Sequence, residues 1–316
     1  MTVRPATPSD TDRIVELLKL SLGDVSTTKS AHFWRWKHLD NPFGASHVLL
    51  AEADGILVGV RAFMQWRWTD GRREYSALRA VDTATHPGYR GRGIFKKLTL
   101  QLIAERTAAG DDFIFNTPNS QSKPGYLKMG WQEVGRLPVA LRINRPLALL
   151  QRKLGWAAAA WEPAPADVAK ERDAFDWSLW EDWAGSPVQG WSTAYRPKYI
   201  GWRYRDCPVA NYLPLGQRNS YLLVVHPKVT ALGLEFRVVQ AHVGPGQVGA
   251  AQAALQDLRR QFTPDYTSVA PGRNFDWGVS WIRREVGPVL TFRRLTFDQA
   301  PALTDWQYQL GDMELF

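Results

Sequence analysis

The sequence predicts an α/β protein in which helices flank a mixed, mostly antiparallel central sheet, and it predicts that this arrangement occurs twice in tandem. Three apolar runs in the first hundred residues are separated by Asp54-Gly55 and Asp70-Gly71, which are typical of tight hairpin turns. A glycine-containing turn then joins the third run to an amphipathic segment. A short stretch in the last third echoes one in the first, which indicates a repeat.

Apolar spacing and turn residues give the order of elements in the first half. Thr7-Pro8-Ser9-Asp10 is typical of a helix start, and Pro42 ends the second helical segment. The expected elements are helices over 9–22 and 30–38, strands over 48–52, 56–68 and 74–85, a helix over 92–109, a strand over 113–116, a helix over 120–128 and a strand over 131–143.

Length and composition narrow the class of protein. The chain has 316 residues, 45% of them hydrophobic, which is enough for one large or two medium domains. The single cysteine, Cys207, excludes an internal disulfide and fits a reducing compartment. The N-terminus lacks the apolar core of a signal peptide, and no run approaches the length of a membrane span, so we expect a cytoplasmic protein. The net charge of +8 is scattered, which favours an anionic small ligand over DNA or a membrane.

The turn from His86 to Lys97 is the most informative stretch. It lies between an expected strand and an expected helix, and it contains Gly91 and Gly93 with Arg and Lys around them. Unpaired N–H groups at a helix N-terminus, together with the helix dipole, favour a bound phosphate, and glycine lets a ligand approach the backbone closely. An ordinary basic loop that caps a helix is the alternative.

Arg90-Gly91-Arg92-Gly93-Ile94-Phe95 resembles the acyl-CoA-binding signature of the GNAT family of N-acetyltransferases, with Arg90 and Gly93 at the matching positions. Phe95 departs from that signature, where a small residue is usual, and is expected to narrow the space beside the pyrophosphate. The order of elements over residues 1–143 is also that of the GNAT fold. The resemblance implies acetyl-CoA as the acyl donor. It assigns the pyrophosphate to Arg90, Gly91, Arg92, Gly93, Ile94 and Phe95, and the pantetheine arm to Thr83, Ala84 and Thr85.

A second segment resembles the same family. Asn119, Tyr126, Lys128 and Gly130 are in register with its Asn-x-x-Ala-x-x-x-Tyr-x-Lys-x-Gly-Phe pattern, while Ser122 replaces the Ala and Trp131 the Phe. The resemblance implies that Tyr126 is the general acid beside the CoA sulfur and that Asn119 hydrogen-bonds the pantetheine arm. A packed aromatic residue at a helix end is the alternative for Tyr126.

The general base is less clearly indicated. Asp82 is the carboxylate nearest to the signature and is the candidate, although a solvated or salt-bridged Asp is the alternative, and water can also serve. His86 precedes a proline and is expected to be structural. The aromatic, acidic tail could bring Asp312, Glu314 or the terminal carboxylate to a cationic substrate, but a packed terminus is the default.

No metal site is expected, because the six His residues show no ligand spacing and the chain has no Cys pair. No serine nucleophile elbow appears either, so direct attack by an amine is expected.

The domain division follows from the echo. Trp202-Arg203-Tyr204-Arg205-Asp206-Cys207-Pro208 repeats the pattern of residues 36–42, although chance could produce it. Strands over 221–225, 231–241 and 281–295 and a helix over 246–262 are expected after it. We therefore predict a GNAT domain over 1–143, a Trp-rich helical connector over 144–195 that packs between the halves, and a degenerate GNAT-like domain over 196–316. Residues 243–246 lack arginine, so the second half is expected not to bind CoA.

The predicted function is transfer of an acetyl group from acetyl-CoA to the primary amine of a small molecule or peptide, by direct attack in a ternary complex. Two alternatives stay open. One is a tandem GNAT-type transferase that takes an aminoacyl or peptidyl group from tRNA, which salt-sensitive tRNA binding would favour. The other is a non-catalytic protein that binds CoA.

Overall fold

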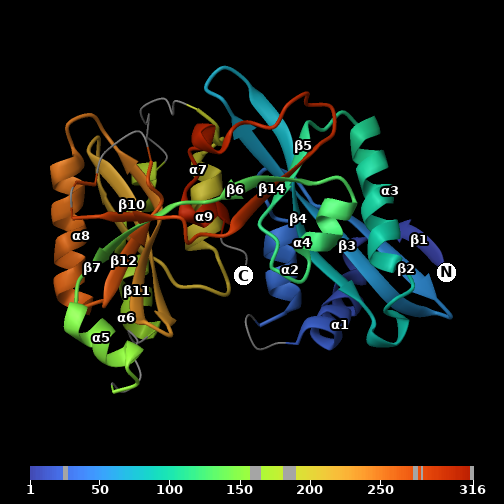
Figure 1. Cartoon of the computed structure of the whole chain (residues 1–316), viewed down its shortest axis with the longest axis horizontal. Coiled ribbons are helices and arrows are strands. Elements are labelled where there is room, and N and C mark those ends of the chain that lie inside the picture. The colour runs from blue at the N-terminus through green and yellow to red at the C-terminus, as the bar shows by residue number, and fades with distance from the viewer. Residues whose placement is uncertain (24–27, 157–164, 181–189, 273–276, 279, 314–316) are drawn as a thin grey trace. The chain divides into compact units, whose positions relative to one another are not determined.

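The computed structural model describes residues 1–23, 28–156, 165–180, 190–272, 277–278 and 280–313 (Figure 1). The chain forms two compact units, and each is made of separate stretches of sequence. Of the residues just named, the first unit contains those within 1–135 and 288–305, and the second contains those within 136–287 and 306–313. Among the described residues, no helix is long and apolar enough to cross a membrane.

The first unit contains a sheet with helices packed against it. Its described elements are β1 (Thr2–Pro5), α1 (Thr11–Leu22), α2 (Ala31–His38), β2 (His47–Ala53), β3 (Ile56–Thr69), β4 (Glu74–Thr85), α3 (Ile94–Ala108), β5 (Phe113–Asn116), α4 (Lys123–Lys128), β6 (Gln132–Arg136) and β14 (Val289–Arg294). The strand order is β1-β2-β3-β4-β5-β14-β6, with β4 and β5 parallel. The expected meander and the helices α1, α2 and α3 are confirmed, and Ser30 caps α2 by accepting a hydrogen bond from the N–H of Phe33.

Two irregularities in β4 shape this unit. Arg61 on β3 pairs with Thr83 and the next residue, Ala62, pairs with Val81, so Asp82 is a bulge residue, with φ of 34°. On its other edge β4 pairs with β5 through Ala77 to Arg79, and the rest of β4 has no partner on that side among the paired strands. The second half of β4 therefore has a free edge that faces away from β3.

The second unit is built on the same plan. Its described elements are β7 (Val139–Ile143), α5 (Pro146–Lys153), α6 (Pro165–Ala174), β8 (Ser192–Thr193), α7 (Pro197–Ile200), β9 (Leu213–Gln217), β10 (Tyr221–Thr230), β11 (Gly233–Val243), α8 (Val248–Phe262), β12 (Tyr266–Val269), β13 (Ile282–Arg284) and α9 (Leu310–Met313). Its sheet has the order β13-β7-β12-β11-β10-β9, and β11 and β12 are parallel.

The domain boundaries differ from the prediction because the last strand of each half breaks in two. The strand expected over 131–143 divides into β6, in the sheet of the first unit, and β7, which pairs with β12 in the second. The strand expected over 281–295 divides into β13, beside β7, and β14, which pairs with β5 in the first unit. Apolar alternation identifies a strand but not its partner, so the sequence pattern does not show this exchange.

The predicted connector over 144–195 is also corrected. Its described helices α5 and α6 belong to the second unit, where α6 packs on β9 and Val168 is part of the apolar core. Residues 157–164 and 181–189, which include part of the tryptophan cluster, lie outside the described residues. A connector and a domain element share the same amphipathic pattern, so composition alone did not separate them.

Candidate active site

The free edge of β4 forms one wall of a cleft of about 790 Å³ in the first unit. The opposite wall comes from the segment that follows β5 and from α4. The cleft is lined by Leu22, Lys37, Ala80, Val81, Asp82, Thr83, Ala84, Thr85, Phe95, Asn116, Thr117, Pro118, Asn119, Gln121, Ser122, Gly125 and Tyr126. Thr83, Ala84 and Thr85, to which the resemblance assigns the pantetheine arm, lie on this edge, where an extended ligand could pair with the backbone.

The basic turn lies immediately after this edge. Gly91 and Gly93 have φ of 76° and 73°, which favours glycine, and a side chain built at either would meet open space. The first bond of α3 runs from the N–H of Lys97 to the carbonyl of Gly93, so the N–H groups of the first turn have no partner within the helix. This geometry fits a phosphate group.

Side chains around the turn hold it in place and add charge. The Arg90 guanidinium donates to the carbonyl of Ser21, 3.0 Å away, and the Arg92 guanidinium lies over the Tyr89 ring at 4.6 Å. His86 accepts a hydrogen bond from the N–H of Gly88, which fits the structural role expected for it. Both arginines are exposed, so their charge is available to an anion at the turn.

Tyr126 lies at the end of the cleft with only 4% of its surface exposed. Its hydroxyl accepts a hydrogen bond of 2.9 Å from Nη1 of Arg61. Phe95 packs edge-on against its ring, with 5.7 Å between centroids, and a Cβ atom at Gly125 would lie 3.3 Å from the Phe95 ring. Phe95 thus lines the cleft and also buttresses Tyr126, a contact that its place in the signature did not indicate.

Two asparagines mark the wall that follows β5. Asn119 holds the turn before α4, because its Oδ1 accepts hydrogen bonds of 2.9 Å from both the N–H and the hydroxyl of Ser122, the N-cap residue of that helix. Its side-chain amide group lies at the cleft lining, where the pantetheine arm was predicted. Asn116 is buried at the end of β5 and is held by Thr291 on β14, whose Oγ1 lies 2.6 Å from the Asn116 Oδ1.

The bulge places Asp82 between two basic side chains of α2. Its Oδ2 lies 2.7 Å from Nζ of Lys37 and 2.8 Å from Nε2 of His38, and Nδ1 of His38 lies 2.8 Å from the Ser46 hydroxyl. Burial acts to raise the pKa of Asp82, but the attraction of Lys37 and the bond to His38 outweigh it and hold this pKa well below its usual range. The salt-bridged alternative therefore describes Asp82, and its low pKa makes it a weak proton acceptor. Burial lowers the pKa of His38, so this ring is neutral at pH 7.

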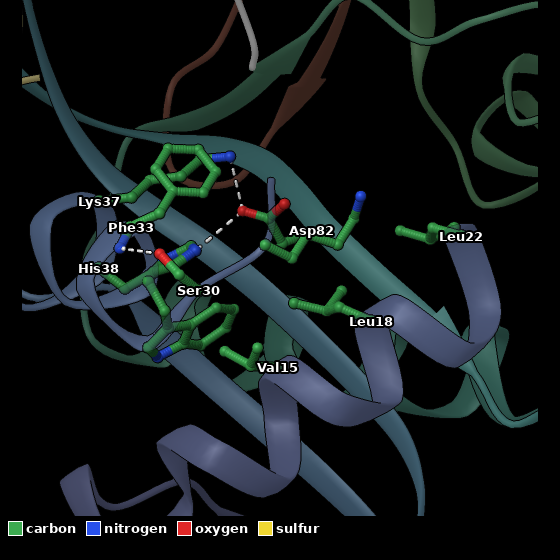
Figure 2. Close-up of a pocket in the computed structure, with 10 residues that line it drawn as sticks. Val15, Leu18, Leu22, Ser30, Phe33, Lys37, His38 and Asp82 are labelled. Atoms are coloured by element: carbon green, nitrogen blue, oxygen red, sulfur yellow. Dashed lines mark hydrogen bonds and ion pairs between the residues drawn. The ribbon is translucent and has the colours of Figure 1, made fainter. Parts of the chain in front are cut away.

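A smaller pocket of about 140 Å³ adjoins the cleft, and Leu22, Lys37 and Asp82 line both (Figure 2). Figure 2 shows Val15, Leu18 and Leu22 on α1 facing the α2 side chains across this space, with Asp82 at its edge. Half of its lining residues are apolar or aromatic, and its lining also includes the charged residues Lys29, Lys37 and Asp82.

Asp312 lies elsewhere than the tail hypothesis required. It is fully buried in the second unit, where it accepts hydrogen bonds from Thr193 Oγ1 (2.9 Å), the Tyr195 hydroxyl (2.5 Å) and the N–H of Gln309 (2.7 Å). A fully buried, saturated carboxylate cannot meet a substrate. Glu314 and the terminal carboxylate lie outside the described residues.

Sequence reasoning missed four residues around the site: Lys37, His38, Arg61 and Asn116. A charged residue within the apolar run 56–68 is a signal for Arg61, and a polar residue at the end of a buried strand is one for Asn116. Nothing local marked Lys37 and His38, whose burial depends on the distant bulge at Asp82. Within the described ranges, no group of three or more His, Cys, Asp or Glu residues could hold a metal ion.

Comparison with known proteins identifies the first unit. A family model described as acetyltransferase (GNAT) domain matches residues 2–134. This part of the chain is therefore similar to a GNAT acetyltransferase domain. The chain is also similar to an L-methionine sulfoximine/L-methionine sulfone acetyltransferase of Salmonella typhimurium, with 29% identity over 106 residues. That match covers 32% of this chain and 60% of the relative, so the chain spans less than two thirds of that protein's length.

Solved structures, among them one of a GCN5-related N-acetyltransferase, share the fold over most of the chain. A GCN5-related N-acetyltransferase from Anabaena variabilis has a TM-score of 0.61 and 14% identity, covering 93% of this chain and 72% of its own. A probable N-acyltransferase from Enterococcus faecalis has a TM-score of 0.61 and 11% identity, covering 93% and 73%. Eis1 from Mycobacterium abscessus has a TM-score of 0.57 and 14% identity, covering 93% and 74%. At these identities the likeness concerns the fold, which is the mixed α/β fold expected from the sequence.

Proposed function

We propose that this GNAT protein transfers the acetyl group of acetyl-CoA to the primary amine of a small molecule or peptide by direct attack. One observation carries the proposal: a single cleft is lined by the free edge of β4, by Phe95 in the first turn of α3, directly after the basic turn, and by Tyr126. These are the parts that a long thioester with a phosphorylated end requires. The turn would bind the pyrophosphate, and the edge over residues 83–85 would pair with the pantetheine arm.

Tyr126 is the proposed general acid. Tyr126 lines the cleft, and its hydroxyl would give a proton to the departing sulfur. Asp82 is proposed to accept a hydrogen bond from the acceptor amine and so to orient it. Because the pKa of Asp82 is depressed, we assign removal of the amine proton to solvent and not to this carboxylate.

The pocket in Figure 2 is the proposed acceptor site, since Lys37 and Asp82 form its border with the cleft. Its apolar lining fits an acceptor with a compact hydrophobic body. Two lysines against one carboxylate repel an acceptor with several positive charges, so we favour a monoamine over an aminoglycoside-like polyamine. The Salmonella relative is named for small amino-acid substrates, which supports a small acceptor.

Calorimetric titration with acetyl-CoA tests the cofactor assignment, and the two units supply a matched pair of variants. Gly93 and Gly246 both have φ of 73°, and neither has an atom within 4 Å of a built Cβ. Gly93→Glu should abolish binding, because it places a negative side chain in the phosphate turn. Gly246→Glu should leave one binding site per chain.

Thiol release in a panel of amines then tests the transfer. Phenethylamine and leucine should release CoA faster than spermidine or kanamycin. If the wild-type protein binds no acetyl-CoA, or if both glycine variants lose binding equally, the assignment of the turn is wrong, and tRNA-dependent transfer becomes the hypothesis to test.

A further inference from the structure

Arg61 is a charged residue in the interior of the first unit. It lies in the middle of β3, and its side chain is 0% exposed. Taking a guanidinium out of water costs several kcal/mol unless other groups compensate for it. A buried arginine is therefore expected to lie beside a group that its positive charge stabilises.

The described contacts of Arg61 converge on Tyr126. Nη1 donates the 2.9 Å hydrogen bond to the Tyr126 hydroxyl, while Nε and Nη2 are buried with no hydrogen-bond partner among the described residues. The guanidinium also lies over three aromatic rings, at 4.8 Å from Phe63, 5.3 Å from Tyr126 and 5.6 Å from Phe95. These rings hold the charge in place but do not neutralise it.

The direction of the hydrogen bond has a chemical consequence. Arginine carries donors and no acceptor, so the Tyr126 oxygen must accept from it. The hydroxyl hydrogen of Tyr126 then points elsewhere, and Tyr126 lines the cleft. We infer that Arg61 is the positioning residue of the general acid: it orients the Tyr126 hydroxyl toward the departing sulfur and stabilises the phenolate left after proton transfer. This inference rests on the proposed acetyl transfer.

The step balances as follows. The acceptor nitrogen forms a bond to the acetyl carbon, the carbon–sulfur bond breaks with its electron pair going to sulfur, and Tyr126 gives its phenolic proton to that sulfur. The proton lost by the nitrogen passes to solvent, and solvent returns one to the phenolate. Between those events the phenolate faces the buried Arg61 guanidinium, and the low local dielectric favours such a pair.

A double-mutant cycle in steady-state kinetics separates this role from simple packing. Arg61→Met should lower kcat about 10- to 100-fold with little change in the KM for acetyl-CoA. In a Tyr126→Phe background the same change should lower kcat by less than about 3-fold, because the group through which Arg61 acts is gone. Arg61→Lys, which keeps the charge, should recover part of the lost kcat.

Arg79 provides the matched control. It is 1% exposed on β4, and its guanidinium lies over the rings of Trp66 and Phe115. Arg79→Met should destabilise the fold as much as Arg61→Met does. Any factor by which Arg79→Met lowers kcat, however, should be the same or larger in the Tyr126→Phe protein than in the wild type. Thermal unfolding of each variant shows whether it is folded at the assay temperature.

Tyrosine labelled with ¹³C at Cζ gives a readout that needs no turnover. The Tyr126 signal, identified by its loss in Tyr126→Phe, should move in Arg61→Met at fixed pH and stay in place in Arg79→Met. The inference is overturned if the Tyr126 signal does not move in Arg61→Met. It is also overturned if Arg61→Met lowers kcat by the same factor with and without Tyr126. Neither outcome would contradict the proposed acetyl transfer. A wild-type protein that binds acetyl-CoA but acetylates no amine overturns the proposed function itself.

Discussion

The two units contain the same pair of diverging parallel strands, but they use the gap between them differently. In the first unit β4 and β5 pair at residues 77–79, and the free edge beyond them lines the cleft. In the second unit β11 and β12 pair at residues 235–238, and the edge beyond them is covered by the chain's own residues 309–311. Gln309 donates through Nε2 to the carbonyl of Ala241 at 3.0 Å, and a Cβ atom at Gly311 would lie 2.9 Å from the carbonyl oxygen of Val239.

Corresponding residues in the two units show why the edge of β4 is open and that of β11 is covered. Each strand has a bulge before its free edge, with Asp82 as the extra residue in β4 and Val239 in β11. Lys37, which reaches Asp82 in the first unit, corresponds by the echo to Arg203, whose Nη2 donates to the carbonyl of Gly311. The first unit thus has the carboxylate of Asp82 beside its cleft. At the matching position the second unit has the apolar Val239, and residues 309–311 cover the strand edge there. The second edge is therefore structural, and we propose that acetyl-CoA binds to the first unit alone.

Asp312→Ala should have the largest effect of the three substitutions, and it should act on stability. Asp312 supports the segment that covers the edge of β11, and it has no role in the open cleft beside β4. Its loss leaves Thr193, Tyr195 and the N–H of Gln309 without their shared acceptor, which should cost about 3 kcal/mol of unfolding free energy. Urea unfolding followed by tryptophan fluorescence measures this. Asp257→Ala, at an exposed position of α8, should change stability by less than about 0.5 kcal/mol. The comparison fails if Asp312→Ala instead weakens acetyl-CoA binding at unchanged stability.

A smaller effect concerns pH, through His242 on the covered half of β11. Burial lowers the pKa of His242 to about 4, whereas an unfolded histidine titrates near 6.5. Between these values the unfolded chain binds more protons, so the stability from neutral His242 is complete above pH 6.5 and is lost as the pH falls toward 4. Allowing for its partial exposure, we expect a loss of about 1 kcal/mol at pH 5. The drop in urea midpoint between pH 7 and pH 5 should be smaller in His242→Gln, and an equal drop would contradict this.

The smallest effect should come from Arg90, in the basic turn after β4, and it should appear in acetyl-CoA binding. Arg90 is exposed and makes one described hydrogen bond, to the Ser21 carbonyl, so Arg90→Gln should raise the Kd for acetyl-CoA by about 2- to 5-fold. Titration at two salt concentrations checks the cause, because the difference from wild type should shrink at high ionic strength. A difference that persists at high salt would mean that the Ser21 contact, and not charge, is what matters.

Much of the first unit could be predicted from the sequence because its signals are local. The Asp-Gly turns fixed the meander, and the glycines of the basic turn fixed the start of α3, where the structure has positive φ. The exchange of β7 and β14 could not be predicted, because which strand pairs with β5 depends on contacts across more than 170 residues. For the same reason the sequence placed Asp82 near the turn without revealing Lys37. It left Asp82 open between a general base and a solvated or salt-bridged carboxylate, a choice that distant residues decide.

The pairing of β14 with β5 has a consequence for biosynthesis. Thr291 on β14 holds Asn116 at the wall of the cleft, so this wall is finished 175 residues after Asn116 itself has been made. A ribosome that adds roughly 5–20 residues per second leaves the partly made first unit with an uncovered β5 edge for about 10–35 seconds. During that interval the nascent chain has an incomplete cleft, and the exposed edge of β5 carries unpaired backbone groups that can pair with another chain. The proposed acetyl transfer should therefore begin only after β14 has emerged, and chaperone demand should be greatest for chains that stall between residues 116 and 289.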